Sequence, residues 1–186
     1  MAPIRVRPTR ADIWIADAIS DHTGRSMEEA ARVLTWGADE KIICALAAGW
    51  WLYSRNRGGR QRRDADHILI TTLAASALPH LLKTVFDQKR PDRRTVLGHM
   101  RGIPLSGKKD DAFPSGHAVH IGALASAAST LPPRQRTLVW SVGAGLVSTR
   151  VVLLAHWVSD VAAGLAVGVV LERMLRFVTG YGRPER

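Results

Sequence analysis

Apolar residues in this chain are collected into five runs that are separated by polar or charged stretches. The runs are Ile42–Tyr53, Ile68–Phe86, Ala118–Leu131, Leu138–Ala155 and Trp157–Val170, each with few charged side chains. A helix that crosses the hydrocarbon core of a bilayer needs about 20 apolar residues, with about 17 as a practical minimum. The second and fourth runs reach this length alone, and the others need their flanks. The pattern predicts an all-α protein, an integral membrane helical bundle with about five transmembrane helices.

The same runs also fit the core helices of a soluble all-α protein. Small residues favour the membrane interpretation, because they let helices approach each other closely in lipid. Eight of them lie within the last three runs: Gly122, Ala123, Ala125, Ser126, Gly143, Gly145, Gly164 and Gly168. The first run is the weakest candidate, because charged residues occupy positions 39–41 just before it.

The length predicts a single domain, 1–186, in which residues 1–30 form an N-terminal segment. Acidic residues interrupt the stretch that follows the first arginines, so no secretory signal is expected there. Trp14, Ile15 and Ile19 fall on one helical face, which is typical of a helix lying in the membrane interface. A helix packed on the protein itself fits the same pattern, and both interpretations stay open.

Basic residues and a glycine-containing turn suggest a phosphate site. Lys83 and Arg90 are seven residues apart, so both cations can lie on one helical face if the helix continues that far. In the stretch 114–117, Ser115 is a good N-cap for a following helix. Gly116 lets backbone N–H groups approach an anion closely at the positive end of that helix. These residues together predict a cradle for a phosphoryl group.

A third stretch adds one more cation and a histidine with an acidic neighbour. Arg150 supplies the cation, and His156 and Asp160 are four residues apart, so the carboxylate can hold the imidazole. A neutral histidine is a competent nucleophile at phosphorus when a carboxylate fixes its tautomer. His117, beside the predicted cradle, is left as the acid for the leaving oxygen. Zinc is not expected, because three cations crowd the site and would repel a divalent metal.

The three stretches resemble the signature of the type 2 phosphatidic acid phosphatases. That signature reads Lys-x6-Arg-Pro, then Pro-Ser-Gly-His, then Ser-Arg-x5-His-x3-Asp, and all three parts occur here in order between residues 83 and 160. The one departure is Thr149 where serine is usual, and it keeps a hydroxyl.

The resemblance implies an enzyme that hydrolyses phosphate esters of lipids through a phosphohistidine on His156, with His117 protonating the leaving group. The implied site residues are catalytic His156, His117 and Asp160, and phosphate-binding Lys83, Arg90, Ser115, Gly116 and Arg150. No cofactor or metal is implied. Family members act on phosphatidic acid, phosphatidylglycerol phosphate and polyprenyl diphosphates, and no residue here selects among them. His120 is expected to pack or to support the site rather than to react.

Two other functions fit some of these features. The related haloperoxidases bind vanadate with the same motifs, but they are larger soluble proteins. A non-catalytic membrane protein that binds phosphorylated lipid is the second alternative, against which the complete set of His117, His156 and Asp160 argues. A nucleic-acid partner is not expected: the formal net charge of +10 suits anionic lipid and phosphate, and no helix-turn-helix pattern accompanies it. The oligomeric state stays unknown.

Charged turns predict the orientation in the membrane. The turns Ser54–Arg63 and Pro132–Arg136 are rich in arginine and carry no motif residue, so the positive-inside rule places both in the cytoplasm. The motifs then lie at the extracytoplasmic face of a bacterial cytoplasmic membrane, in a multi-pass protein. The segment Asp87–Ser115 on that side is also basic. Because it joins the first two motifs, its positive charge can have a role other than setting the orientation in the membrane.

Overall fold

The computed structural model describes residues 3–91 and 111–183. The N-terminal elements are β1 (Ile4–Arg5), α1 (Arg10–His22), α2 (Arg25–Leu34) and the 3₁₀ helix η1 (Thr35–Ala38). The helices of the bundle are α3 (Glu40–Ser54), α4 (Gly59–Val85), α5 (Gly116–Ala127), α6 (Pro133–Val152) and α7 (Val158–Thr179). Two short elements complete the fold: β2 (Phe86–Asp87), which pairs in parallel with β1, and the 3₁₀ helix η3 (Ala128–Thr130).

Most of each apolar run lies in one helix of the bundle, and the prediction of a mostly helical protein is confirmed. The boundaries differ where polar residues extend or end a helix. For example, α6 begins at Pro133, in the arginine-rich turn, and ends at Val152, before the run does. Within the described residues, α4 is the helix whose length and composition suit a membrane crossing, with 27 residues and a mean hydropathy of 1.4 over its most apolar window. The number of about five crossings stays a prediction.

The centre of the bundle is α5, which packs against α7 along its whole length. Three of the predicted small residues make this contact possible. A Cβ atom added to Gly168 would lie 2.1 Å from the Val119 carbonyl oxygen, and one added to Gly122 would lie 2.3 Å from the Leu165 carbonyl oxygen. At Gly164 it would lie 2.6 Å from the Ser115 carbonyl oxygen. The two backbones therefore touch, and this contact sets the distance between the residues at the start of α5 and those at the start of α7.

A methyl group at this contact is expected to lower stability. Gly168→Ala must push α5 and α7 apart, which costs about 1–3 kcal/mol when a packed core is overfilled. Thermal unfolding in detergent should show a lower midpoint for this variant. Gly145→Ala is the matched control, because nothing lies within 4 Å of the added Cβ and alanine favours the helix. Equal midpoints for the two variants would contradict the close α5–α7 contact.

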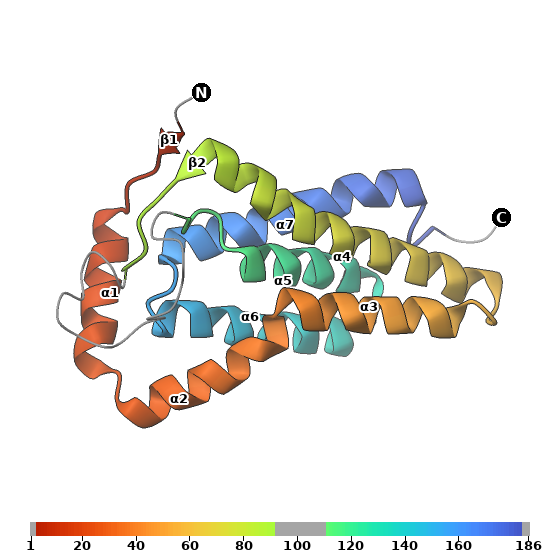
Figure 1. The fold of residues 1–186 in the computed structure, drawn as a ribbon. Coiled ribbons are helices and arrows are strands. Elements are labelled where there is room, and N and C mark those ends of the chain that lie inside the picture. Colours follow the sequence, from red (N-terminus) through yellow and green to blue (C-terminus); the bar gives the residue numbers. More distant parts are fainter. Residues whose placement is uncertain (1–2, 92–110, 184–186) are drawn as a thin grey trace.

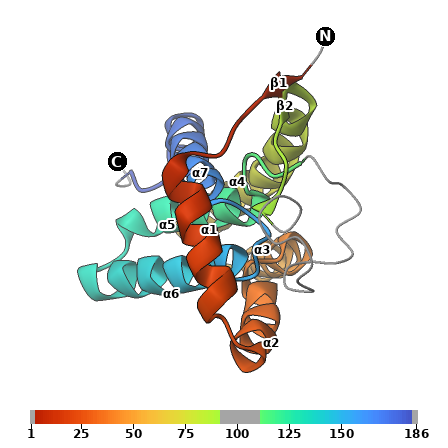
Figure 2. The same cartoon turned by 90° about the vertical axis from the view of Figure 1, so that its left-hand side faces the viewer.

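The helix α1 packs on the bundle across the end where α6 gives way to α7, and Figure 2 views the molecule from that end. Ala16 is buried in a cluster with Leu154 and Trp157. The Asp12 carboxylate accepts hydrogen bonds from the Ser159 backbone N–H at 2.9 Å and from its hydroxyl at 2.8 Å. Trp14, by contrast, is 72% exposed. The helix α1 is therefore packed on the protein, as one of the two interpretations expected, and Trp14 is exposed on its outer face.

The bundle has two chemically different ends (Figure 1). The turn from α3 to α4 and the C-terminus of α7 lie at one end, where Thr130 after α5 contacts Tyr181 after α7. The two arginine-rich turns share this end. At the other end, α4 finishes, α5 begins, and α6 turns into α7. This second end holds all three motifs.

Candidate active site

The first two cations meet at a carboxylate that the sequence patterns did not indicate. The helix α4 ends at Val85, so the condition for placing Lys83 and Arg90 on one helical face, a helix that continues to Arg90, is not met. Instead Asp111 joins the two side chains: Lys83 Nζ lies 3.5 Å from its Oδ2, and Arg90 donates to its Oδ1 at 3.1 Å and 2.8 Å. Burial alone would raise the pKa of Asp111, but Arg90 and Lys83 outweigh burial and lower it. Asp111 is therefore an anion held between two cations.

The third cation, Arg150, enters from the last turn of α6 and is 7% exposed. Its Nη1 donates to the Thr35 hydroxyl at 3.2 Å, so the N-terminal segment helps to hold it. Its buried Nε has no hydrogen-bond partner among the described residues. The Thr149 hydroxyl donates to the Leu146 carbonyl within the helix and does not point to a ligand. Arg150 thus retains a donor for an incoming anion.

The start of α5 offers a serine hydroxyl and a half-buried histidine. Ser115 is at the N-cap position as predicted, but its side chain makes no capping hydrogen bond. Its buried Oγ has no partner within the described residues, and its backbone N–H donates to the Asp160 carbonyl at 3.3 Å. Gly116 begins the helix, and His117 follows it, within the fields of Arg150 and Lys83. The predicted cradle therefore lies beside the cations.

The imidazole of His156 is fixed by a backbone carbonyl rather than by the expected carboxylate. Nδ1 lies 2.7 Å from the Ala112 carbonyl oxygen, which can only accept, so Nδ1 carries the proton. The lone pair is then on Nε2, the atom that can attack phosphorus. Burial, together with Arg90, Arg150 and Lys83, lowers the pKa of His156 well below its usual value. The ring is neutral at physiological pH and suited to act as a nucleophile.

Asp160 supports this arrangement from the first turn of α7. Its Oδ2 accepts a hydrogen bond from the Trp157 backbone N–H at 2.9 Å and lies 3.7 Å from His156 Nδ1. It therefore caps the helix and lies beside the imidazole without hydrogen bonding to it. The Trp157 indole N–H donates to the Lys89 carbonyl at 2.8 Å, which ties the segment before Arg90 to α7.

The turn from α6 to α7 brings Arg150 and His156 together. The N–H groups of Ala155 and His156 both donate to the Arg150 carbonyl, at 3.0 Å and 3.2 Å. Leu154 has a φ of 52°, a conformation that a branched side chain adopts only at a cost, and it is fully buried. This tight turn holds the backbone of His156 against the C-terminal end of the helix that carries Arg150.

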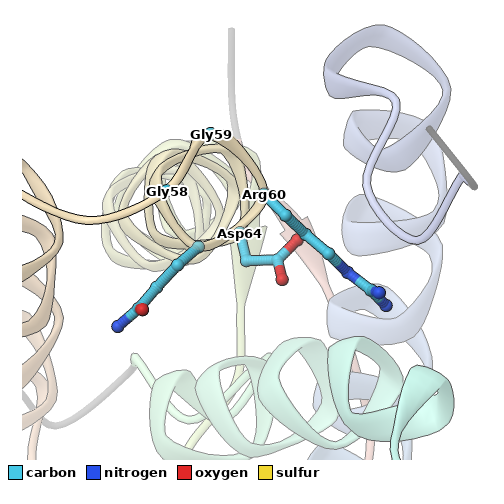
Figure 3. A pocket seen from close by; sticks show the side chains of 5 residues that line it. Gly58, Gly59, Arg60 and Asp64 are labelled. Atoms are coloured by element: carbon cyan, nitrogen blue, oxygen red, sulfur yellow. The ribbon is translucent and has the colours of Figure 1, made fainter.

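Other candidate groups lie outside this arrangement. His120 is buried, with Nε2 3.3 Å from the Ser76 hydroxyl, in keeping with the expected packing role. A cavity of about 420 Å³ lies at the opposite end of the bundle, lined by Gly58, Gly59, Arg60, Gln61 and Asp64 (Figure 3). It contains no motif residue. The candidate site is therefore the end at which α5 and α7 begin.

The sequence profile of the PAP2 superfamily matches residues 66–181, which is more than half of the chain and includes all three motifs. The chain belongs to the PAP2 superfamily. The resemblance drawn from the three motifs is confirmed.

Two curated relatives of this PAP2 protein are named lipid A 1-phosphatase, one from Rhizobium johnstonii and one from Rhizobium etli. Each is 37% identical over 103 residues, or 55% of this chain. The match covers 42% of the first and 44% of the second, so the chain matches less than half of either relative.

Solved PAP2 structures share the fold. The structure of Aquifex aeolicus LpxE superposes with a TM-score of 0.74 at 15% identity, covering 92% of this chain and 98% of that one. A transmembrane PAP2-type phosphatidylglycerolphosphate phosphatase from Bacillus subtilis gives a TM-score of 0.64 at 19% identity, covering 95% of this chain and 88% of that one. At these identities the likeness concerns the fold.

Four groups in this PAP2 site were missed by the motif search: Asp111, the Ala112 carbonyl, Asp12 and Thr35. Asp111 had a usable signal, because it stands just before the second motif and several cations nearby need a counter-charge. The Ala112 carbonyl had none, since every residue has one. Asp12 and Thr35 come from the N-terminal segment, and their partners are known only from the folded chain.

Proposed function

We propose that this chain is a membrane phosphatase that removes phosphate from a lipid through a covalent phosphohistidine on His156. The observation that carries the proposal is the gathering, at one end of the bundle, of three cations, an unpartnered serine hydroxyl and two histidines, one with its proton fixed on Nδ1. Cations neutralise the equatorial oxygens of a phosphoryl group in the transition state. Arginine is suited to two-pronged contacts with those oxygens.

The proposed reaction has two displacement steps. In the first, His156 Nε2 attacks phosphorus, the bond to the lipid oxygen breaks, and His117 gives that oxygen a proton. The phosphate brings negative charge beside His117, which favours the protonated acid. In the second, a water that has lost its proton to His117 attacks the phosphohistidine and releases inorganic phosphate. The residues Lys83, Arg90 and Arg150, with Ser115 and the backbone at Gly116, hold the phosphoryl oxygens in both steps.

The outer surface of the helices supports a membrane location. Large apolar side chains are exposed along α3, α4, α6 and α7: Leu46, Trp50, Leu73, Leu81, Leu138, Val142, Val170, Met174 and Phe177. Soluble monomers rarely expose apolar patches of this extent. The buried residues include many polar ones, among them His67, Thr71 and Glu172. A chain that is apolar outside and partly polar inside suits a lipid environment.

The names of the two curated relatives support a phosphorylated lipid as the substrate. Both curated relatives are named for the 1-phosphate of lipid A, and the matched 103 residues are 37% identical. Lipid A therefore joins phosphatidic acid, phosphatidylglycerol phosphate and polyprenyl diphosphate as a candidate. In each, the phosphate lies at the interface while the chains remain in lipid, which fits a site at the end of a bundle.

Phosphate release from purified protein in detergent tests the proposal across these four lipids. We expect turnover of at least one lipid, no loss with a metal chelator, and inhibition by vanadate, which resembles five-coordinate phosphorus. Activity should survive a chelator because Lys83, Arg90 and Arg150 supply the positive charge that a metal ion would otherwise supply. Activity that a chelator abolishes and one divalent ion restores would overturn the metal-free mechanism. Absence of turnover on every lipid would favour a non-catalytic binding protein.

Asp111 is expected to act as a positioning residue for the two cations. In Asp111→Asn the side chain keeps its size, but Lys83 and Arg90 lose their anion, so their geometry relaxes while the positive potential rises. We expect kcat to fall about tenfold to a hundredfold, with KM not increased and inhibition by inorganic phosphate stronger. Asp87→Asn, in the adjacent β2, is the control and should leave both constants unchanged. If Asp111 had only a structural role, the variant would give less folded protein, and kcat would not fall while KM stayed the same.

We also propose that the site opens on the extracytoplasmic face. Both arginine-rich turns lie at the end opposite the motifs, and arginine in short turns favours the cytoplasm. Residues 92–110 of the basic segment lie outside the described residues. In a Cys44→Ser background, Asp21→Cys near the site should react with an impermeant thiol reagent in intact cells, and Asn56→Cys only after lysis. The reverse labelling would invert the topology and leave the catalytic assignments unchanged.

A further inference from the structure

The end of the bundle opposite the motifs carries a basic pocket with a volume of about 290 Å³. It is lined by Arg173, Arg176, Phe177, Tyr181 and Arg183. The chain reverses direction after α7, because Gly180 and Gly182 have positive φ values of 69° and 76°. The Arg183 N–H donates to the Gly180 carbonyl at 3.2 Å, which closes the reversal. This reversal brings Arg183 to the same pocket as Arg173 and Arg176, which lie in the last turns of α7.

One wall of this pocket is held rigidly by hydrogen bonds. Arg176 Nε donates to Glu172 at 2.8 Å, and its Nη2 donates to the Ser126 carbonyl at 2.8 Å and to the Ser129 hydroxyl at 3.0 Å. The Tyr181 ring stacks on His67 with 4.2 Å between ring centres, and the Arg176 guanidinium lies 5.5 Å from the Tyr181 ring. These groups come from α4, α5, η3, α7 and the turn that follows α7. The pocket is thus organised before any ligand arrives.

The pocket has an excess of positive charge. Glu172, which is fully buried, contacts both Arg173, at 4.0 Å, and Arg176, at 2.7 Å. In the neighbouring cavity at this end, Figure 3 shows Arg60 pointing from the first turn of α4 toward α7, with Asp64 one turn further along α4. Three guanidinium groups line the pocket itself, those of Arg173, Arg176 and Arg183, and the Glu172 carboxylate pairs with the first two. A ligand that binds this pocket should carry negative charge.

We propose that this pocket binds the head-group phosphate of an anionic phospholipid that is not a substrate. Phe177 forms part of the pocket and is 78% exposed, and Val178 beside it is 84% exposed. An apolar surface adjoining the arginines gives the acyl chains a place to lie, which a free phosphate would not need. Basic pockets at the cytoplasmic ends of membrane helices bind lipid head groups in this way. The inference requires a membrane protein with this end at a lipid surface, but not phosphatase activity.

Native mass spectrometry of detergent-purified protein with added phosphatidylglycerol tests the proposal. Phosphatidylglycerol is a phosphodiester, so the candidate active site has no terminal phosphate to remove from it. Arg173→Gln combined with Arg183→Gln removes the two exposed cations, with the contacts of Arg173 to Ser126 and Glu172, and keeps the hydrogen bonds of Arg176 to Glu172, Ser126 and Ser129. We expect about thirtyfold weaker retention of one lipid molecule in this double variant. Arg134→Gln, in the first turn of α6 at the same end, is the matched control and should bind as the wild type does.

Further arms separate the pocket from general effects. Replacing both arginines by lysine keeps the charge and should keep most of the binding. Any binding at the motif end is common to all variants and cancels in the comparison. Equal retention by the double variant and the control would overturn the proposal. Equal retention of phosphatidylcholine, or full displacement of the lipid by an equal concentration of inorganic phosphate, would also overturn it.

Discussion

Replacing His156 by alanine is expected to abolish phosphate release while lipid phosphate still binds. In the proposed mechanism this imidazole supplies the attacking Nε2, because the Ala112 carbonyl holds its proton on Nδ1. Loss of an activated nucleophile lowers kcat by at least about 10⁴-fold. Binding should change little, because Lys83, Arg90 and Arg150 remain. Turnover is measured as phosphate release, and binding as retention of a labelled lipid phosphate.

His80→Ala is the control for this experiment. His80 lies in α4 one turn before Lys83, but its side chain is mostly exposed and contacts Glu40 at 3.7 Å, so its loss should leave turnover near the wild-type rate. A phosphorylated protein trapped by acid quench should carry phosphate in the wild type and in His80→Ala but not in His156→Ala. Trapping of phosphate on His156→Ala would show that another residue is the nucleophile.

The second large effect is expected for His117→Ala, and its size should depend on the leaving group. With a lipid alkoxide the missing proton should slow the first step about 10²- to 10⁴-fold, the usual contribution of a general acid. An aryl phosphate leaves without that proton, so formation of the phosphohistidine from it should be nearly unaffected. The measurement compares the first turnover of the two substrates by rapid quench.

The second step of the proposed reaction provides a check on the acid role of His117. Because the proposed mechanism also has His117 activate the water in the second step, phosphoenzyme should accumulate in His117→Ala when the aryl phosphate is supplied. A burst of aryl alcohol followed by slow turnover is the expected trace. Equal slowing of both substrates in the first turnover would mean that His117 binds the phosphate rather than protonating the leaving oxygen.

The candidate site could be predicted from the sequence because its groups are residue types at fixed spacing. The three motifs identified the cations, both histidines and Asp160, and the apolar runs identified the five helices that carry them. What spacing could not supply is the path of the chain between motifs. The seven residues from Lys83 to Arg90 suggested one helix, but β-pairing of Phe86–Asp87 with the N-terminus ends it at Val85.

The orientation of His156 shows a second limit. A carboxylate four residues on is a reasonable partner by helical spacing, but the helix α7 begins only at Val158, after a turn that points the imidazole elsewhere. Asp160 then accepts a hydrogen bond from the backbone N–H of Trp157, and the Ala112 carbonyl accepts one from the imidazole Nδ1–H. Backbone acceptors from distant segments carry no sequence signature, so a structure was needed to find this one.

The parallel bridge between Gln88 and Asp111 brings the two ends of the intervening segment side by side, and the Ala112 N–H donates to the Gln88 carbonyl at 3.0 Å. The same bridge presents the Asp111 carboxylate to Lys83 and Arg90 and the Ala112 carbonyl to His156. Chain length between two joined ends changes the free energy of loop closure only slowly. Evolution can therefore lengthen, shorten or rewrite residues 92–110 while Arg90, Asp111 and the other groups of the candidate site stay in place. We expect homologues to differ most there, and a graft of this segment from a relative to transfer head-group preference without altering the chemistry.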